Sequence, residues 1–208
     1  MNLVIIGPPG SGKGTQAERI AEHYQLKHFS TGDTFRAAMA SNSELGNQLK
    51  IIIDKGGLVP DELVNEVIKD AIEKYEGEGL LFDGYPRTQA QAAFLQSILT
   101  VDGVISVSVS DEEVVKRISS RYFCPQCSKA YNTVTLPPKQ AGKCDVDGAR
   151  LQQRGDDKPE AVQQRLVEYH AKTEPIIRFY EKAGVKIHSI SGEQPIDDVF
   201  EDIKQALG

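Results

Sequence analysis

The sequence lacks the features that mark exported, membrane-spanning and disulfide-stapled proteins. Its 208 residues include three cysteines, an odd number that cannot close a disulfide framework. No apolar run approaches the ~18 residues that a membrane helix needs, because charges or glycines interrupt every candidate. The N-terminus has no basic segment before its short apolar stretch at 3–6. We therefore expect no signal peptide, no membrane association and a cytoplasmic protein.

Positive charge is also in deficit. The chain has 24 Lys and Arg against 30 Asp and Glu, a net charge of −6 that argues against general affinity for nucleic acid. What the chain does have is apolar content, at 39% of its residues, which is too much for a disordered protein. A chain of this length buries a real core, and it suggests one domain with insertions.

Short β-rich runs alternate with helical stretches, which is typical of a parallel sheet wrapped by helices. We predict strands at 2–6, 27–30, 80–83, 104–109 and 185–190. Helices are predicted at 13–24, 31–39, 61–75, 88–99, 111–120, 158–183 and 195–207. The fold class is therefore α/β, with a parallel five-stranded sheet flanked by helices.

Two segments depart from this alternation. Residues 31–60 indicate two short helices that end in the turn Gly56-Gly57, between the second and third predicted strands. Residues 121–156 contain all three cysteines, Pro125 and the pair Pro137-Pro138, and show no helical period. A stretch that long without regular structure is usually a functional insertion. We expect two small subdomains inserted into one core.

A phosphate-binding loop follows the first predicted strand. Residues 7–15 read GPPGSGKGT, close to G-x-x-x-x-G-K-[ST], with Gly14 at the Ser/Thr place and Thr15 one residue later. Glycines let backbone N–H groups converge on phosphate oxygens, and the N-terminus of the following helix adds partial positive charge. Lys13 is expected to reach the β- and γ-phosphates, and Thr15 to lie near phosphate or the shell of a Mg²⁺ ion. The strand–loop–helix context favours this over a plain glycine-rich turn and predicts a P-loop NTPase-type fold.

The cysteines have the spacing of a four-ligand zinc site. Cys124 and Cys127 form a C-x₂-C pair, and Cys144 and Asp147 form a later C-x₂-D pair. Asp147 is preferred over Asp145 because it holds the second ligand position of its pair. Four protein ligands leave no open position for water, so the zinc would be structural. The alternative is three idle thiols and a solvated carboxylate.

The chain resembles the bacterial adenylate kinases of the long-lid, zinc-containing type, and the match spans nearly all of its residues. The segments that carry the resemblance are the phosphate loop and residues 30–36, 57–62, 82–87, 154–157 and 165–170. The phosphate loop of that family also reads Gly-Lys-Gly-Thr, so Gly14 supports the match. The resemblance implies reversible Mg²⁺-dependent transfer of the terminal phosphoryl group of ATP to AMP, giving two ADP and balancing the adenine nucleotides.

The resemblance also implies three parts. A core with the P-loop would comprise residues 1–30, 61–120 and 157–208, residues 31–60 would be an AMP-binding insert, and residues 121–156 a zinc-binding lid. The protein would use ATP, AMP and ADP as small-molecule partners. We expect a monomer, because the sequence suggests no dimer interface.

Site residues follow from the resemblance, position by position. The catalytic cations would be Lys13, Arg87, Arg121, Arg154 and Arg165. ATP would contact Gly10, Ser11, Gly12, Lys13, Gly14, Thr15, Arg121, Ala130, Tyr131 and Gln194. AMP would contact Thr31, Arg36, Gly57, Leu58, Val59, Gly84, Tyr85, Pro86, Arg87, Gln91, Arg154 and Arg165. Thr15 and Asp83 would act on magnesium through water.

Other functions remain open from the sequence. The nearest is a kinase for UMP or CMP, against which Thr31 argues because pyrimidine enzymes usually have a smaller residue there; a GTP-using variant is also conceivable. A zinc-ribbon protein that hydrolyses ATP on nucleic acid is disfavoured by the net charge and by the lack of a basic, aromatic-rich surface signature. A nucleotide-sensing scaffold without catalysis is disfavoured by the five arginines at motif positions. Arg117 matches a further family arginine, but Lys116 beside it also fits a solvated helix face.

Overall fold

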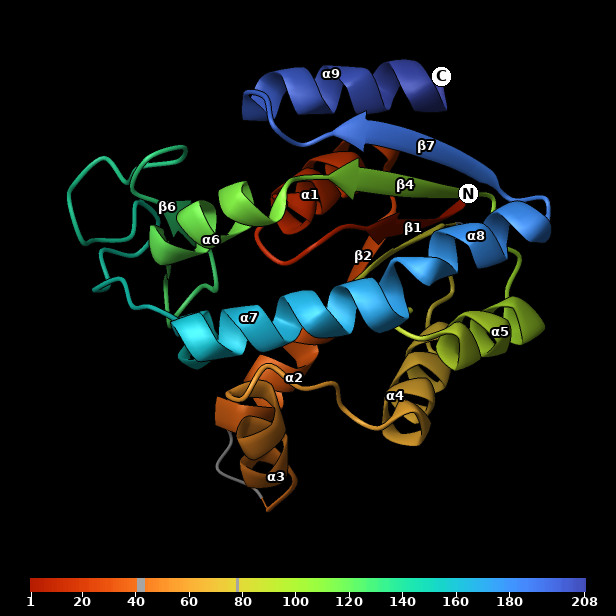
Figure 1. The fold of residues 1–208 in the computed structure, drawn as a ribbon, viewed down its shortest axis with the longest axis horizontal. Coiled ribbons are helices and arrows are strands. Elements are labelled where there is room, and N and C mark those ends of the chain that lie inside the picture. Colours follow the sequence, from red (N-terminus) through yellow and green to blue (C-terminus); the bar gives the residue numbers. More distant parts are fainter. Residues whose placement is uncertain (41–43, 78) are drawn as a thin grey trace.

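The computed structural model describes residues 1–40, 44–77 and 79–208. A parallel sheet with the strand order β2-β3-β1-β4-β7 forms its centre (Figure 1). The strands of this sheet are β1 (Asn2–Ile6), β2 (Lys27–Ser30), β3 (Leu80–Asp83), β4 (Gly103–Ser108) and β7 (Lys186–Ser191). The helices are α1 (Lys13–Tyr24), α2 (Thr31–Ala40), α3 (Glu44–Ile53), α4 (Asp61–Glu73), α5 (Gln89–Ile98), α6 (Asp111–Ser119), α7 (Pro159–Glu168), α8 (Pro175–Lys182) and α9 (Ile196–Leu207). The predicted α/β fold with a five-stranded parallel sheet is confirmed.

Both faces of the sheet are covered, as the consecutive apolar residues of its strands require. In β1, Leu3 and Ile5 pack with α1 and α9, whereas Val4 and Ile6 belong to the cluster on the opposite face. That second cluster is the larger one and draws in side chains from α2, α4, α5 and α8. Because side chains alternate across a strand, one short apolar run supplies both layers.

The strand ends differ from the sequence prediction by one residue in β4 and β7. Gly103 already pairs with Leu3 and with Lys186, so the ladder begins before Val104. At the other end Ser108 pairs with Ser191. Ladder hydrogen bonds rather than apolar character therefore set these ends.

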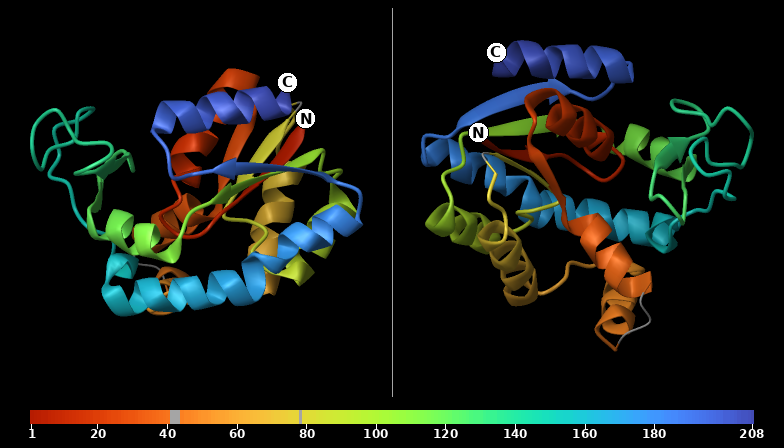
Figure 2. Two further views of the ribbon diagram at one scale, coloured as in Figure 1. Left: turned by 45° about the horizontal axis from the view of Figure 1, so that its top comes forward. Right: turned by 180° about the vertical axis from the view of Figure 1, so that it is seen from behind.

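The segment 31–60, here called the 31–60 insert, contains the two predicted helices α2 and α3. Residues 41–43 between them lie outside the described residues. Figure 2 shows α2 and α3 extending away from the sheet beside α7. Phe35 and Leu49 bury their side chains in the larger core cluster, so this insert shares the core of the sheet.

The segment 121–156, here called the 121–156 insert, was expected to have no regular structure, and this was wrong in part. Strands β5 (Arg121–Phe123) and β6 (Ala130–Asn132) form a small antiparallel sheet. A short 3₁₀ helix, η1 (Gly155–Asp157), ends the segment. Three-residue strands are too short to produce a period-2 pattern, which is why the sequence did not indicate them.

The single helix predicted at 158–183 is interrupted. A π-helical segment, η2 (Tyr169–Thr173), separates α7 from α8. Pro175 has no N–H to continue the α-helical ladder, and the N–H of Glu174 donates instead to the carbonyl of Tyr169 at 2.8 Å. The described residues include no helix that is both long and apolar enough to cross a membrane.

Candidate active site

The loop between β1 and α1 places Lys13 at the carboxyl edge of the sheet. Gly12 precedes the helix with φ at 85°, a left-handed conformation that favours glycine. The loop is closed by the N–H of Ser11, which donates to the carbonyl of Pro8 at 3.2 Å. The ammonium of Lys13 donates to the same carbonyl at 3.2 Å. The predicted strand–loop–helix context of this motif is confirmed.

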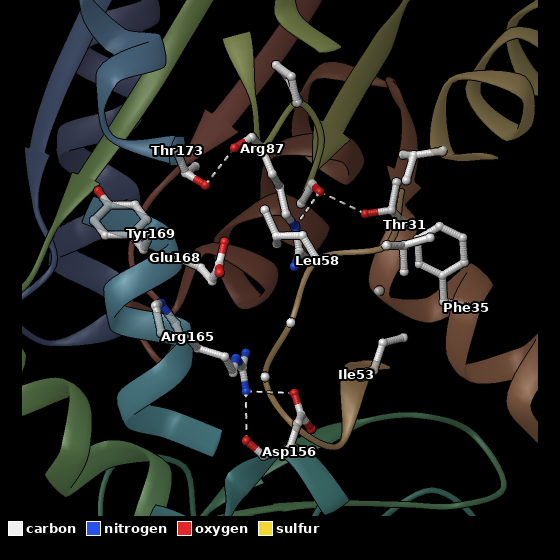
Figure 3. Close-up of a pocket in the computed structure, with 18 of the residues that line it drawn as sticks. Thr31, Phe35, Ile53, Leu58, Arg87, Asp156, Arg165, Glu168, Tyr169 and Thr173 are labelled. Atoms are coloured by element: carbon white, nitrogen blue, oxygen red, sulfur yellow. Dashed lines mark hydrogen bonds and ion pairs between the residues drawn. The ribbon is translucent and has the colours of Figure 1, made fainter. Parts of the chain in front are cut away.

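A pocket, here called the enclosed pocket, lies between the sheet edge, the 31–60 insert and the α7–η2 helix (Figure 3). The predicted AMP-binding residues that line it are Thr31, Arg36, Gly57, Leu58, Val59, Gly84, Pro86, Arg87, Gln91 and Arg165. Its apolar side is formed by Phe35, Ile53, Val64 and Tyr169. The apolar side chains can contact a flat ring system, and the arginines can bind a negatively charged group.

The carbonyl of Gly84 organises one end of the enclosed pocket. It accepts a hydrogen bond from Thr31 Oγ1 at 2.9 Å and another from Arg87 Nε at 2.7 Å (Figure 3). Gly84 has φ at 76°, and a Cβ there would lie 2.9 Å from Thr31 Oγ1 and 3.0 Å from an Arg87 terminal nitrogen. Only glycine allows this turn to approach both side chains.

Thr31 and Gln91 line the enclosed pocket but already have protein partners. Gln91 is 2% exposed; its Oε1 accepts from the N–H of Arg87 at 2.7 Å and its Nε2 donates to Asp61 at 2.7 Å. Thr31 is 1% exposed and uses its hydroxyl on Gly84. The expected contact of these two residues with the acceptor base stays a prediction, and in this structure they position Arg87 and its turn.

A second hollow, here called the open cavity, lies over the phosphate loop. It is bounded by α1, the 121–156 insert and the loop that precedes α9. The predicted ATP-binding residues Gly10, Ser11, Gly12, Lys13, Gly14, Thr15, Arg121, Ala130, Tyr131 and Gln194 all line it. Gln194 donates from its amide to Asp202 at 2.6 Å and to the carbonyl of Ser191 at 3.2 Å.

The two hollows share a group of four cations. Lys13, Arg36, Arg87 and Arg165 line both the enclosed pocket and the open cavity. Burial lowers the pKa of Lys13 to about 7. Asp83 opposes this shift, and the positive charges of Arg87, Arg165 and Arg121 add to it. The same desolvation is the main cause that lowers the pKa of Arg165 to about 10. Half-buried cations that repel one another form a site for a multiply charged anion.

Two arginines that line the open cavity form ion pairs with the two carboxylates of η1. Arg165 Nη1 lies 2.6 Å from Asp156 Oδ2, and Arg121 Nε donates to Asp157 Oδ2 at 2.9 Å. Burial alone would raise the pKa of Asp156, but Arg165, Arg121, Arg154 and Arg36 hold it below its ordinary value. Arg154 stacks over Phe123, and its buried Nε has no hydrogen-bond partner among the described residues. Mainly through burial, the pKa of Arg154 falls to about 9.

Two side chains with oxygen atoms that suit a magnesium ion line the cavity at the phosphate loop. Asp83 ends β3 and is 9% exposed, and it lines the open cavity together with Thr15. His28 Nε2 is 3.6 Å from Asp83 Oδ2. Burial would lower the pKa of His28, but Asp83, Asp33 and Glu18 raise it. A carboxylate and a hydroxyl next to a phosphate loop are the donors that a hydrated Mg²⁺ ion prefers, so these residues fit the ion.

Four side chains of the 121–156 insert form a cluster that fits a metal ion. The ligand atoms of Cys124, Cys127, Cys144 and Asp147 all lie within 4.8 Å of one another. Cys124 Sγ is 3.1 Å from Asp147 Oδ2, and Cys127 Sγ is 3.5 Å from Cys144 Sγ. A tetrahedral zinc site with Zn–S bonds of ~2.3 Å separates its sulfurs by about 3.8 Å. The donor set and its spacing therefore suit zinc.

The two halves of this cluster have the same backbone geometry. Cys124 accepts at its carbonyl from the N–H of Ser128, and Cys144 accepts from Gly148, both at 3.0 Å. Asp147 thus stands where Cys127 stands in the first half. Asp145 is directed elsewhere, because its Oδ1 accepts from the N–H of Lys139 at 2.8 Å. Between the two aspartates, only Asp147 joins the cluster.

Two expected AMP contacts lie apart from the enclosed pocket. Tyr85 is 1% exposed, and its hydroxyl donates to Asn65 at 2.8 Å within the core. Arg154 lines the open cavity instead. The side chain of Tyr85 packs in the larger core cluster and therefore does not line the pocket.

Sequence reasoning missed several residues that line the hollows. Tyr169 and Thr173 line the enclosed pocket, and His28 and Glu18 line the open cavity. His28 precedes Ser30 by two positions on β2, so strand periodicity places them on one face. Tyr169 and Thr173 are four residues apart in a helical segment, and that spacing was a usable signal.

Comparison with known proteins shows the family of the chain. A sequence model described as "Adenylate kinase" matches residues 5–185. The adenylate kinase of Listeria monocytogenes serotype 4a is 46% identical, with 100% of this chain and 99% of that protein covered. The adenylate kinases of Thermosipho africanus and Bacillus velezensis are 47% and 45% identical, over 98% and 100% of this chain and 97% and 98% of those proteins. The chain belongs to the adenylate kinase family.

Proposed function

We infer that the chain is an ATP:AMP phosphotransferase that moves the terminal phosphoryl group of ATP to AMP reversibly, giving two ADP. One observation carries the assignment of its site. The enclosed pocket and the open cavity meet at Lys13, Arg36, Arg87 and Arg165. Two nucleotides placed in these hollows bring their phosphates together at that group of cations. The enclosed pocket is the AMP site and the open cavity is the ATP site.

Charge neutralisation is the main task of these residues, because phosphoryl transfer needs little covalent help. Lys13 binds the phosphates of ATP, and a bound anion restores the positive charge that burial disfavours. Arg36 and Arg87 bind the phosphate of AMP with planar guanidinium groups. Arg121 and Arg165 exchange Asp157 and Asp156 for the transferring group, and Arg154, whose Nε has no partner among the described residues, joins them there. No general base is assigned.

Magnesium enters the reaction with ATP, and there it would supply positive charge and orientation to the phosphate oxygens. Asp83 and Thr15 are the residues proposed to hold its water shell. Asp83 ends β3 at the carboxyl edge of the sheet, where ligands of open α/β sheets bind. The buried position of Asp83 beside Lys13 keeps this carboxylate near the reacting phosphates.

The division into parts follows from the same arrangement. We propose a core of residues 1–30, 61–120 and 157–208, with the 31–60 insert closing on AMP and the 121–156 insert closing on ATP. Closure excludes water, which would otherwise accept the phosphoryl group. Zinc held by Cys124, Cys127, Cys144 and Asp147 gives the 121–156 insert its internal structure.

A cytoplasmic monomer is the proposed state. Large apolar side chains that are exposed among the described residues, such as Ile51, Ile98, Val115 and Val167, lie on four different helices. Scattered apolar residues of this kind do not form a patch for a stable dimer. Sedimentation at several concentrations tests this, and a concentration-dependent mass would contradict it.

A coupled assay with ATP and Mg²⁺ tests the activity, with AMP, UMP, CMP and GMP as acceptors. AMP is expected to be the fastest acceptor, and a faster reaction with another base would overturn the assignment. Lys13→Ala should abolish transfer with little change in folding, because the partner of this lysine is the ligand. Arg87→Ala should weaken AMP binding and reduce the rate, with ATP affinity unchanged.

The matched control is Arg178→Ala, which removes an exposed arginine on α8. It should behave like the unaltered protein with both nucleotides. If Arg87→Ala used AMP as well as this control does, the AMP site would be wrongly placed.

A further inference from the structure

The helical segment that follows the 121–156 insert contacts Arg87 through one side chain. Thr173, the last residue of η2, donates from its Oγ1 to the backbone carbonyl of Arg87 at 3.0 Å. Figure 3 shows this bond at the wall of the enclosed pocket. Thr173 is 8% exposed, so water does not compete freely for the carbonyl. The bond joins two segments that are 86 positions apart in the chain.

The π-helical turn determines where Thr173 points. Pro175 cannot donate a backbone hydrogen bond, and Glu174 donates five positions back to Tyr169 at 2.8 Å. The wider turn adds a residue, and each residue rotates the following side chains by about 100° around the helix axis. Tyr169 and Thr173 are both buried as a result, at the two ends of η2. Pro175 thus accounts for a hydroxyl that faces the pocket wall.

Arg87 is fixed at three points, and two of its partners, Gln91 on α5 and Thr173 on η2, lie on helical segments. The N–H of Arg87 donates to Gln91 Oε1 at 2.7 Å, and its Nε donates to the carbonyl of Gly84 at 2.7 Å. Within the described part of the chain, its two terminal nitrogens make no hydrogen bond or ion pair. The guanidinium is therefore held in place with these nitrogens available for a ligand.

We propose that Thr173 is a positioning residue for the phosphoryl-transfer site, acting through the carbonyl of Arg87. It fixes Arg87, on the loop after β3, relative to Arg165, which α7 carries on the same helical segment. The spacing of these two arginines sets how the acceptor phosphate meets the transferring group. The proposal rests on the assignment of Arg87 to the AMP phosphate.

Three single variants test the proposal by AMP and ATP titration and by steady-state kinetics. Thr173→Val keeps the branched shape and removes the hydroxyl, leaving a buried carbonyl without its donor. We expect it to raise the KM for AMP by about tenfold and to reduce kcat, with the KM for ATP unchanged. Thr173→Ser retains the hydroxyl and should restore both values. Ser97→Ala, which removes a hydroxyl that donates to the carbonyl of Phe94 within α5, should change neither value.

A double variant separates positioning from structure. In an Arg87→Ala background the carbonyl remains but the guanidinium is gone, so adding Thr173→Val should cause no further loss of AMP affinity. Its effect on the thermal midpoint should be the same in both backgrounds. A further loss of AMP affinity, or equal losses for AMP and ATP, would make Thr173 merely structural and overturn the proposal.

Failure of the AMP-site assignment would look different. In that case Arg87→Ala itself would leave AMP use unchanged, whatever the Thr173 variants do. If Arg87→Ala is impaired while Thr173→Val titrates like the unaltered protein, only the positioning role is overturned. If Thr173→Ser is impaired as much as Thr173→Val, the hydroxyl is not the cause, and the positioning role is likewise overturned.

Discussion

The two inserts are too small to have a large hydrophobic core, and they are stabilised in different ways. In the 31–60 insert, Phe35, Leu49 and Val59 bury their side chains in the larger core cluster of the sheet. The 121–156 insert instead has a small cluster of its own, whose buried members are Cys124, Tyr131, Cys144 and Leu151. Two of these four are proposed metal ligands.

The comparison teaches what each insert depends on. An insert that shares a core loses stability together with the whole protein. An insert whose centre is a metal site keeps its structure only while the metal is bound, since too few apolar residues remain to hold it. Four experiments are ordered from the largest expected effect to the smallest, and the first three can break or sharpen this contrast.

Metal loss should give the largest effect, and a local one. Cys144→Ser or Asp147→Ala should lose zinc and leave amide exchange in the 121–156 insert fast, while the sheet stays protected. Structural zinc sites contribute about 10–16 kcal/mol in isolated zinc-finger peptides, so the insert should not hold its structure without the ion. Metal analysis and hydrogen exchange provide the measurements.

Asp145→Ala is the matched control for the metal site, because Asp145 bonds to Lys139 outside the cluster. It should retain one zinc per chain. Protein purified without chelator and found to hold no zinc, or a Cys144→Ser variant with an unchanged thermal midpoint, would contradict this account.

A core change in the other insert should act globally. Leu49 on α3 is 2% exposed, and Leu49→Ala should lower the free energy of unfolding by about 2–5 kcal/mol. Denaturant unfolding should show one transition that shifts as a whole. Ile51→Ala on the same helix removes a side chain that is 61% exposed, and it should change the free energy by less than about 0.5 kcal/mol. If the 31–60 insert unfolded separately in Leu49→Ala, it would not depend on the core of the sheet.

A ligand that joins two adenosines through phosphates should fill both hollows. At a hundredfold excess over its Kd it stabilises the folded protein by about 2.7 kcal/mol. The 31–60 insert already packs on α7, since a Cβ at Gly56 would lie 2.4 Å from the carbonyl of Ala161. We therefore expect the 121–156 insert to gain more protection from hydrogen exchange than the 31–60 insert. Equal gains would contradict this difference between the inserts, and no gain in either insert would count against closure.

The smallest expected effect concerns pH at the junction between α6 and η2. His170 lies 2.9 Å from Glu174 and 3.0 Å from Asp111, and these carboxylates raise its pKa. A raised folded-state pKa adds stability that is fully present below the ordinary value of about 6.5 and is lost as the pH rises through the folded pKa. His170→Gln should therefore cost about 0.5 kcal/mol at pH 6 and less at pH 9. If the stability lost in His170→Gln grew with pH, the protonated imidazole would not be the stabilising form.

Much of the core could be predicted because its signals are local. The bounds of β1, β2 and β3 agree with the prediction, and in β1 and β3 the signal is a short run of residues that are apolar on both faces of the sheet. The phosphate loop could be predicted because its chemistry needs glycines at fixed places next to Lys13. The carboxyl ends of parallel strands then placed Asp83 and the turn at Gly84 beside the loop.

The remaining features depend on tertiary contacts. The π-helical turn interrupts a stretch that the sequence predicts as one helix, and Pro175 is the residue in the sequence that indicates a break. Strands β5 and β6 are too short for a pattern and lie next to the metal cluster. The partners of Thr31 and Gln91 come from Gly84 and Asp61, which no sequence spacing connects to them.

The shared carbonyl of Gly84 restricts how this site can change over evolution. An alanine in place of Thr31 would leave one of the two hydrogen bonds at that carbonyl unmade. Arg87 relies on the same oxygen through its Nε. If Thr31 contacts the acceptor base as proposed, a substitution that changes base preference would also disturb the turn that holds Arg87, and with it the binding of phosphate.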